Sequence, residues 1–201
     1  VKVAQFSFTR LQGADPTLGV EMASTGEVAC YARDVHTAYL RALQATGFQL
    51  PNPRTRNRLL LSIGSSAYKL EFLDSARLLQ RHGYQLFATP GTAAYYKAHG
   101  VEGIVTLRKP GAGDGEDGTE DVVQALRRGA LDAVINVSAT DEGGEGGGGG
   151  GQACGYALRR TAVDFGVPML TNIKTATLFC AALVRGGGEE VRCMGGWGGG
   201  V

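Results

Sequence analysis

The chain has 201 residues, is 43% hydrophobic and carries a formal net charge of +1 at pH 7. This apolar content is normal for a globular core, and the length allows one or two domains. Because the charge is nearly balanced, nothing in the sequence favours nucleic acid or an anionic membrane as a partner. No apolar run approaches the roughly 20 residues of a membrane-spanning helix, and no secretory leader opens the chain.

Residues 1–50 have an irregular pattern, in which strands are predicted at 6–9 and 27–31 and a helix at 35–45. About fifty residues are marginal as an independent fold. The chain also begins with a valine that falls within a strand-like pattern. We therefore expect a piece of a longer polypeptide in which this part is the closing edge of a larger domain, followed by a linker at 51–57.

Residues 58–185 alternate regularly between short apolar runs and amphipathic stretches. The alternation predicts an α/β fold with three layers, in which a parallel sheet of about five strands has helices on both faces. Thr92 and Thr119 are the predicted N-caps of their helices. Strands are predicted at 59–63, 84–88, 103–107, 131–137 and 167–171, and helices at 70–82, 92–99, 119–128, 155–165 and 174–184.

Two segments have a composition too rich in glycine to bury much surface. Residues 141–151 end in six consecutive glycines and are predicted to form a flexible loop. The tail, residues 186–201, has a similar composition and is predicted to be disordered.

The cysteines and histidines predict no metal site. No pair of cysteines has CxxC spacing, which favours reduced thiols in a reducing compartment and therefore a cytoplasmic location. The histidines lie in or near the ends of predicted helices, where a structural role is typical. These residues are Cys30, Cys154, Cys180 and Cys193, and His36, His82 and His99.

Polar side chains gather where the predicted strands end. In open α/β sheets ligands bind beyond the carboxyl ends of the strands, so these residues are expected to share one edge. Hydroxyls, an amide, a glycine and cations there suit an anion such as phosphate. The candidates are Ser62, Lys69, Thr89, Gly91, Thr92, Lys109 (with Arg108 as its alternative), Asn136 and Ser138. No catalytic residue is predicted, because no histidine and no activated cysteine or serine falls at this edge.

Several stretches resemble a known family. Residues 6–16 (FSFTRLQGADP) and 21–29 (EMASTGEVA) resemble the end of the second ATP-grasp unit of carbamoyl phosphate synthetase large subunits. Residues 86–100, 131–136, 155–168 and 173–179 resemble the methylglyoxal-synthase-like allosteric domain that follows that unit. The resemblance covers nearly the whole chain apart from the glycine-rich segments.

The resemblance implies a regulatory region that binds a phosphate-bearing effector. In this family a lysine, threonines and the loop after the fourth strand hold the phosphate, which fits Ser62, Lys69, Thr89, Thr92, Asn136 and Ser138. The family's ATP and magnesium ligands would lie upstream of this chain, so no cofactor is expected here. The expected partners are the rest of the synthetase and its glutaminase part. The resemblance also allows an oligomer, and it allows an organellar location as the alternative to a cytoplasmic one.

Three comparisons with known relatives indicate which subtype of this family the chain resembles. Val3, Met169 and Leu170 replace residues of ornithine-sensing relatives. Gly91 is kept, and residues 107–109 lack the tryptophan of acetylglutamate-activated relatives. The chain is most similar to eukaryotic glutamine-dependent enzymes of pyrimidine synthesis, which implies UTP or phosphoribosyl pyrophosphate as effector, although the glycine segment lacks their Arg-Arg-x-Ser site.

Two other functions stay open. One is a methylglyoxal-synthase-type lyase acting on dihydroxyacetone phosphate, for which Asp114 or Asp117 could supply a catalytic carboxylate. The other is a non-catalytic interaction domain with an empty pocket. A shared fold does not decide among these functions.

Overall fold

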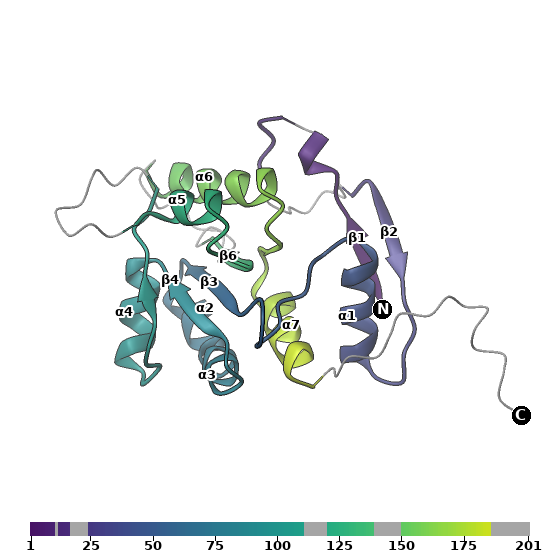
Figure 1. The fold of residues 1–201 in the computed structure, drawn as a ribbon, viewed down its shortest axis with the longest axis horizontal. Helices are drawn as coiled ribbons and strands as arrows, with labels where there is room; N and C mark the ends of the chain where they lie inside the picture. Colours follow the sequence, from purple (N-terminus) through teal and green to yellow (C-terminus); the bar gives the residue numbers. More distant parts are fainter. Residues whose placement is uncertain (11, 17–23, 111–119, 139–149, 186–201) are drawn as a thin grey trace, which may run out of the picture.

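The computed structural model describes residues 1–10, 12–16, 24–110, 120–138 and 150–185 (Figure 1). At its centre is a five-stranded parallel sheet in the order β5-β4-β3-β6-β7. This confirms the predicted α/β fold and its strand number. The strands are β3 (Arg58–Ile63), β4 (Gln85–Ala88), β5 (Val105–Thr106), β6 (Ala133–Val137) and β7 (Met169–Leu170).

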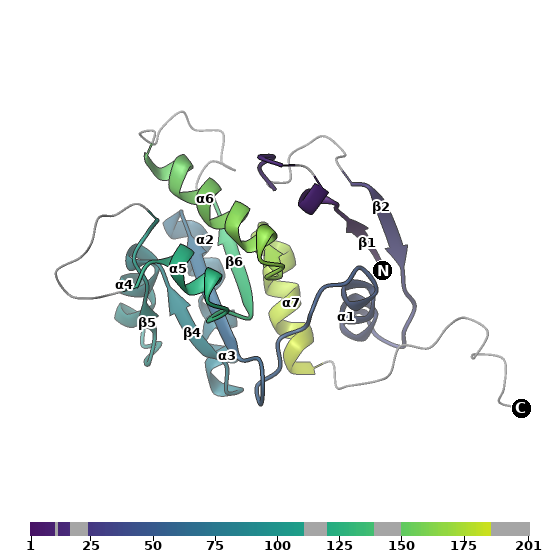
Figure 2. The same ribbon diagram turned by 45° about the horizontal axis from the view of Figure 1, so that its top comes forward.

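Helices cover both faces of this sheet, as Figures 1 and 2 show. Successive side chains of β3 point to opposite faces. Leu59 and Leu61 therefore enter the core formed with α3 (Leu73–Arg81), α4 (Pro90–Ala98) and α7 (Ile173–Arg185). Leu60 enters the second core, with α5 (Val122–Arg127) and α6 (Gly150–Asp164). The prediction that helices cover both faces of the sheet is thus confirmed.

The front segment, which we define as residues 1–50, pairs β1 (Lys2–Gln5) with β2 (Gly26–Ala29) in an antiparallel sheet. It also contains α1 (Val35–Ala45), which packs on α7. Leu43 of α1 is buried in the same core as Phe179 of α7, and the rings of Phe48 and Phe179 meet edge to face at 5.5 Å. One hydrophobic core therefore runs across the predicted boundary at 51–57, while the domain limits themselves stay a prediction.

One predicted strand was wrong, and one predicted helix is divided in two. The strand at 6–9 is absent, because β1 ends at Gln5 and η1 (Phe8–Arg10) is a 3-10 helix. The rings of Phe6 and Phe8 stack at 5.2 Å, so their spacing reflects a local aromatic contact rather than one face of a strand. The helix at 70–82 is two helices, α2 (Ser66–Glu71) and α3, which meet at the fully buried Phe72.

Other boundaries and caps also differ from the prediction. The N-cap of α4 is Thr89, with Pro90 as the first helical residue, so the assignment of Thr92 as the cap was wrong. Asp121 caps α5 in a capping box with Gln124, whereas the predicted cap, Thr119, lies outside the described residues. The helix α6 begins at Gly150, inside the predicted flexible loop. The strands β5 and β7 have two residues each and are shorter than expected.

The histidines at helix ends behave as predicted. His82 and His99 are the C-caps of α3 and α4, and each ring Nδ1 lies within hydrogen-bond distance of a carbonyl oxygen one turn earlier, at 2.8 and 2.7 Å. Gly83 and Gly100 follow with φ near +80°, a conformation that favours glycine after a helix. The described cysteines, Cys30, Cys154 and Cys180, are free thiols.

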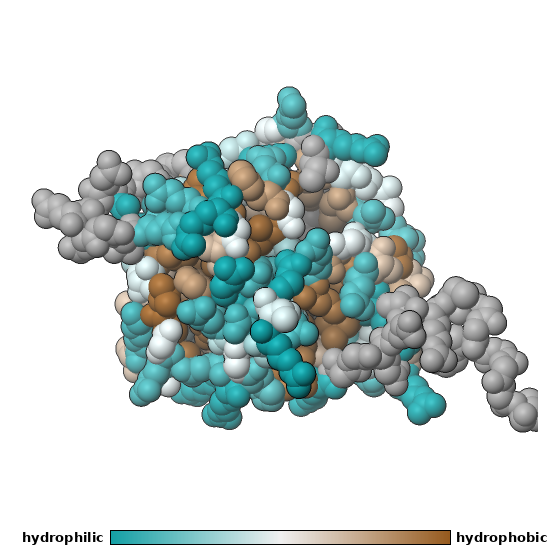
Figure 3. Space-filling view, viewed as in Figure 1, coloured by the Kyte–Doolittle hydropathy of each residue, from teal (hydrophilic) through white to brown (hydrophobic). Residues whose placement is uncertain are grey.

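The surface is mixed in character. Figure 3 shows hydrophilic side chains interspersed with hydrophobic strips on one face of the molecule. Among the described residues, no helix is both long and apolar enough to cross a membrane.

Candidate functional site

The strand order places a topological switch point between β3 and β6. The chain runs outward from β3 through β4 to β5, and later returns to the other side of β3 with β6 and β7. Ser62 of β3 lies opposite Asn136 of β6, and the amide of Gly64 donates to the Val137 carbonyl at 2.9 Å. Ligands of doubly wound sheets bind at this position, at the carboxyl ends of the strands. The predicted residues Ser62, Asn136 and Ser138 therefore meet where such a site is expected.

The turn between β4 and α4 contributes two threonines, and both are buried. The Thr92 hydroxyl accepts a hydrogen bond from the Ile63 amide and donates to the Ile63 carbonyl, each at 3.1 Å. It also accepts from the Thr89 hydroxyl at 3.3 Å. Thr92 thus ties the start of α4 to the end of β3, which fixes the turn beside the switch point.

Gly91 lies in the first turn of α4 and is exposed. A Cβ atom added at this glycine would meet no heavy atom within 4 Å. The space beside Gly91, in the first turn of this nine-residue helix, is therefore open. Amides of a first helical turn lack intrahelical partners and carry the positive end of the helix dipole, so an anion is stabilised at such a position.

Lys69 and Lys109 supply positive charge after β3 and β5. Lys69 lies in the last turn of α2, and Lys109 follows β5. Burial and the positive charge of Lys109 lower the pKa of the Lys69 ammonium. The Lys69 Nζ also lies 6.0 Å from the centre of the Tyr95 ring of α4. An anion bound near both ammonium groups would relieve their repulsion.

Arg159 of α6 is a site residue that sequence reasoning missed. Its side chain is buried, and its Nη1 donates to Asn136 Oδ1 at 3.1 Å and to Ser138 Oγ at 3.3 Å. It is one of two adjacent arginines in a helical pattern, where a solvent-exposed charge is the ordinary expectation. The position of Arg159 on its helix could have identified it only with knowledge of how α6 packs against the end of β6.

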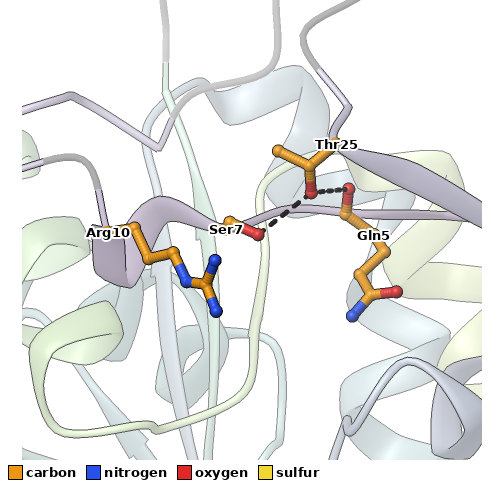
Figure 4. Close-up of a pocket in the computed structure, with 4 residues that line it drawn as sticks. All are labelled: Gln5, Ser7, Arg10 and Thr25. Carbon is orange, nitrogen blue, oxygen red and sulfur yellow. Dashed lines mark hydrogen bonds between the residues drawn. The ribbon is translucent and has the colours of Figure 1, made fainter.

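A separate cavity of about 480 Å³ lies within the front segment (Figure 4). It is lined by Gln5, Ser7, Arg10 and Thr25, and the Thr25 hydroxyl is hydrogen-bonded to Ser7 Oγ and donates to the Gln5 carbonyl, each at 3.1 Å. Sequence analysis placed no site there. All four residues precede the parallel sheet, so this cavity is distinct from the strand-end site.

Within the ranges that the structure describes, no group of three or more His, Cys, Asp or Glu side chains could hold a metal ion. Asp114 and Asp117, the carboxylates of the lyase alternative, lie outside the described residues. The described part of the candidate site offers hydroxyls, an amide and cations, which are groups suited to an anion.

The fold and the site together define a doubly wound α/β domain with a candidate anion-binding edge. Comparison with known families matches residues 71–171 to the MGS-like domain. This match covers half of the chain. The chain belongs to the MGS-like domain family.

Three relatives illustrate the similarity. The chain is 44% identical over 187 residues to "Multifunctional protein URA2" of Saccharomyces cerevisiae, and 42% identical over 189 residues to "Multifunctional protein CAD" of Squalus acanthias. It is 36% identical over 189 residues to "Carbamoyl-phosphate synthase [ammonia], mitochondrial" of Homo sapiens. These matches cover 92%, 91% and 92% of the chain, but only 8%, 8% and 12% of the respective relatives.

Proposed function

We propose that the chain is the effector-binding regulatory region of a carbamoyl phosphate synthase, with a phosphate-bearing effector held at the strand ends. UTP or phosphoribosyl pyrophosphate is the favoured effector, and the chain by itself is non-catalytic and holds no cofactor. The proposal is supported by the family match and by a relative whose name is carbamoyl-phosphate synthase. ATP, magnesium and the chemistry would then belong to other parts of the synthetase.

One observation supports the proposal: hydroxyls and an amide lie at the switch point, and Lys69, the first turn of α4 and Lys109 follow the carboxyl ends of β3, β4 and β5. Lys69 and Lys109 are close enough for one charge to lower the pKa of the other. The first turn of α4 leaves open space at Gly91. Two ammonium groups and helix amides suit a multiply charged phosphate, which binds cationic side chains through charge-assisted hydrogen bonds.

Replacing Lys69 tests the site directly. We expect Lys69→Ala to weaken the binding of UTP or phosphoribosyl pyrophosphate about tenfold or more, because a hydrogen bond to a charged group contributes roughly 1.5–3 kcal/mol. Isothermal titration calorimetry on the full chain measures the dissociation constants. The control is Lys2→Ala, which removes the same charge from β1, where Lys2 pairs with Glu27.

Unchanged affinity in Lys69→Ala, or an equal loss in Lys2→Ala, would place the site elsewhere. If neither compound binds the unmodified chain, the proposed effectors are wrong. Release of phosphate from dihydroxyacetone phosphate by the purified chain would support the lyase alternative instead.

The partners and location follow from the same proposal. The rest of the synthetase and its glutaminase part are the proposed partners, and an oligomer stays a prediction. A cytoplasmic location also stays a prediction, because one relative is named as mitochondrial.

A further inference from the structure

One face of α6 reaches the front segment. In Figure 2 this helix lies between the parallel sheet and the front segment. Tyr156 Oη donates to the Gly13 carbonyl at 2.9 Å, and Arg160 Nη1 donates to the Ala14 carbonyl at 3.2 Å. Arg159 Nε and Nη2 donate to the two carboxylate oxygens of Asp15 at 2.7 and 2.6 Å. Residues three and four apart share a helix face, which is why these side chains act on one stretch of chain.

The same Arg159 guanidinium also reaches the candidate site. Its remaining nitrogen, Nη1, donates to Asn136 and Ser138 at the end of β6. A guanidinium is planar and rigid, so its three nitrogens move together. A change in the partners of Nη1 therefore changes the geometry of the ion pair with Asp15.

The position of this guanidinium depends on a glycine. A Cβ atom added at Gly155, one turn earlier in α6, would lie 2.9 Å from Arg159 Nη1. The absence of a side chain at 155 lets the guanidinium lie against the helix while it contacts both Asn136 and Asp15. Arg159 is 6% exposed, so bulk water does not compete freely for its hydrogen bonds.

We propose that Arg159 is the positioning residue that couples occupancy of the strand-end site to the front segment through Asp15. The inference rests on the proposed function, since it assigns the regulation of that same site. A phosphate beside Asn136 and Ser138 supplies a charged acceptor for Nη1, which draws the guanidinium toward the sheet and weakens its ion pair with Asp15. Because such coupling is reciprocal, a substitution at Asp15 that removes its ion pair with Arg159 also changes the affinity for the effector.

Hydrogen exchange on the full chain tests the coupling in two parts. Without ligand, Asp15→Asn should raise the exchange rates of the amides at 136–138 several-fold, because Arg159 loses its fixed orientation. The control is Asp74→Asn, which removes an exposed carboxylate paired with Arg77 on α3. With saturating UTP, exchange across 8–15 should change in the unmodified chain.

The variant Arg159→Lys separates coupling from a structural role. Lysine keeps the positive charge but is a point charge that cannot engage Asp15 and the end of β6 together. We expect Arg159→Lys to stay folded by circular dichroism and to bind UTP with reduced affinity, so its response is measured at a UTP concentration that saturates the variant. The UTP-induced change at 8–15 should disappear in this variant.

The outcomes distinguish the two proposals. UTP binding with no change at 8–15, and with equal affinity in Asp15→Asn, overturns the coupling and leaves the proposed function intact. If UTP and phosphoribosyl pyrophosphate both fail to bind, the proposed function fails, and the ligand-free experiment decides the coupling. In that case, unchanged exchange at 136–138 in Asp15→Asn overturns the coupling. Where UTP does bind, a UTP response in Arg159→Lys equal to that of the unmodified chain also overturns the coupling.

Discussion

The Thr92 hydroxyl has used all of its hydrogen-bonding capacity within the fold. A hydroxyl has one donor and two acceptor lone pairs, and Thr92 donates to Ile63 and accepts from Ile63 and Thr89. Its removal would leave the buried Ile63 amide without this partner and cost stability. The residue type at the strand end could be predicted from the sequence, but its use within the fold could not, because it depends on how α4 docks on β3.

Gly91→Ala tests the turn without disturbing that network. The added methyl group meets open space, and alanine is favoured over glycine in a helix by roughly 0.5–1 kcal/mol in interior positions, so the melting temperature should not fall. UTP affinity should fall, because the methyl group occupies the approach to the first turn of α4. Differential scanning calorimetry and titration calorimetry measure the two effects.

The matched control for this turn is Gly26→Ala in β2, where a Cβ atom also meets open space. It should leave UTP affinity unchanged. If Gly91→Ala binds UTP as tightly as the parent, the ligand does not approach this turn.

At the scale of elements, the sequence predicted the long buried strands best. The central strands β3 and β6 match their predicted ranges within a residue or two, because continuous apolar runs mark burial on both faces. The edge strands β5 and β7 were overestimated, since few residues there find a ladder partner. The break at Phe72 was missed because the helical periodicity continues across it, and the sequence pattern alone does not show where one helix ends and the next begins.

An ion pair joins the two central strands at the edge opposite the site. The Arg58 side chain donates through Nε and Nη2 to the Asp132 carboxylate at 2.9 and 3.1 Å, and the Arg58 amide donates at 3.0 Å. Burial by itself raises the pKa of Asp132, but the hydrogen bonds from Arg58 outweigh it and hold the pKa below 3.8. Since the folded pKa is lowered, the stabilisation is present above pH 3.8 and is lost as the pH falls through the folded pKa.

We expect Asp132→Asn to lower the free energy of unfolding at neutral pH by roughly 1–3 kcal/mol, the range for losing a charged partner of a buried group. Urea denaturation at about pH 7 and about pH 3 should show the deficit shrinking in acid. Asp74→Asn, at a side chain that is 94% exposed, should change little at either pH. An equal deficit for Asp132→Asn at both pH values would show that the ion pair is not its cause.

Across the whole molecule, the front segment and the parallel sheet share one core. Leu43 of α1 is 4% exposed and belongs to the cluster that contains Phe179 of α7. The sequence indicated a change of pattern near residue 50, and this change is real at the level of elements. It could not show that α1 docks on α7, because amphipathic periodicity identifies a buried face without identifying what covers it.

This shared core predicts one cooperative unfolding transition. Leu43→Ala should lower the free energy of unfolding by roughly 2–5 kcal/mol, as for other buried leucines. Urea unfolding followed by circular dichroism, and hydrogen exchange at β1 and β6, should report the same midpoint and shift together. Leu70→Ala, at a side chain that is 61% exposed, is the control and should change little. Two separate transitions, with only the front segment affected, would contradict the shared core.

The central position of β3 also bears on the order in which the chain folds. β3 pairs with β4 across the helical connection at 64–84. Its pairing with β6 brings together residues much further apart in the sequence, such as Arg58 and Asp132, which are 74 positions apart. Contacts between distant residues carry a larger loop-closure entropy and form slowly. Because the candidate site lies between β3 and β6, it is assembled in a late step. A chain trapped before that step would have its first βα units in place but no effector site, so ligand binding would select fully folded molecules.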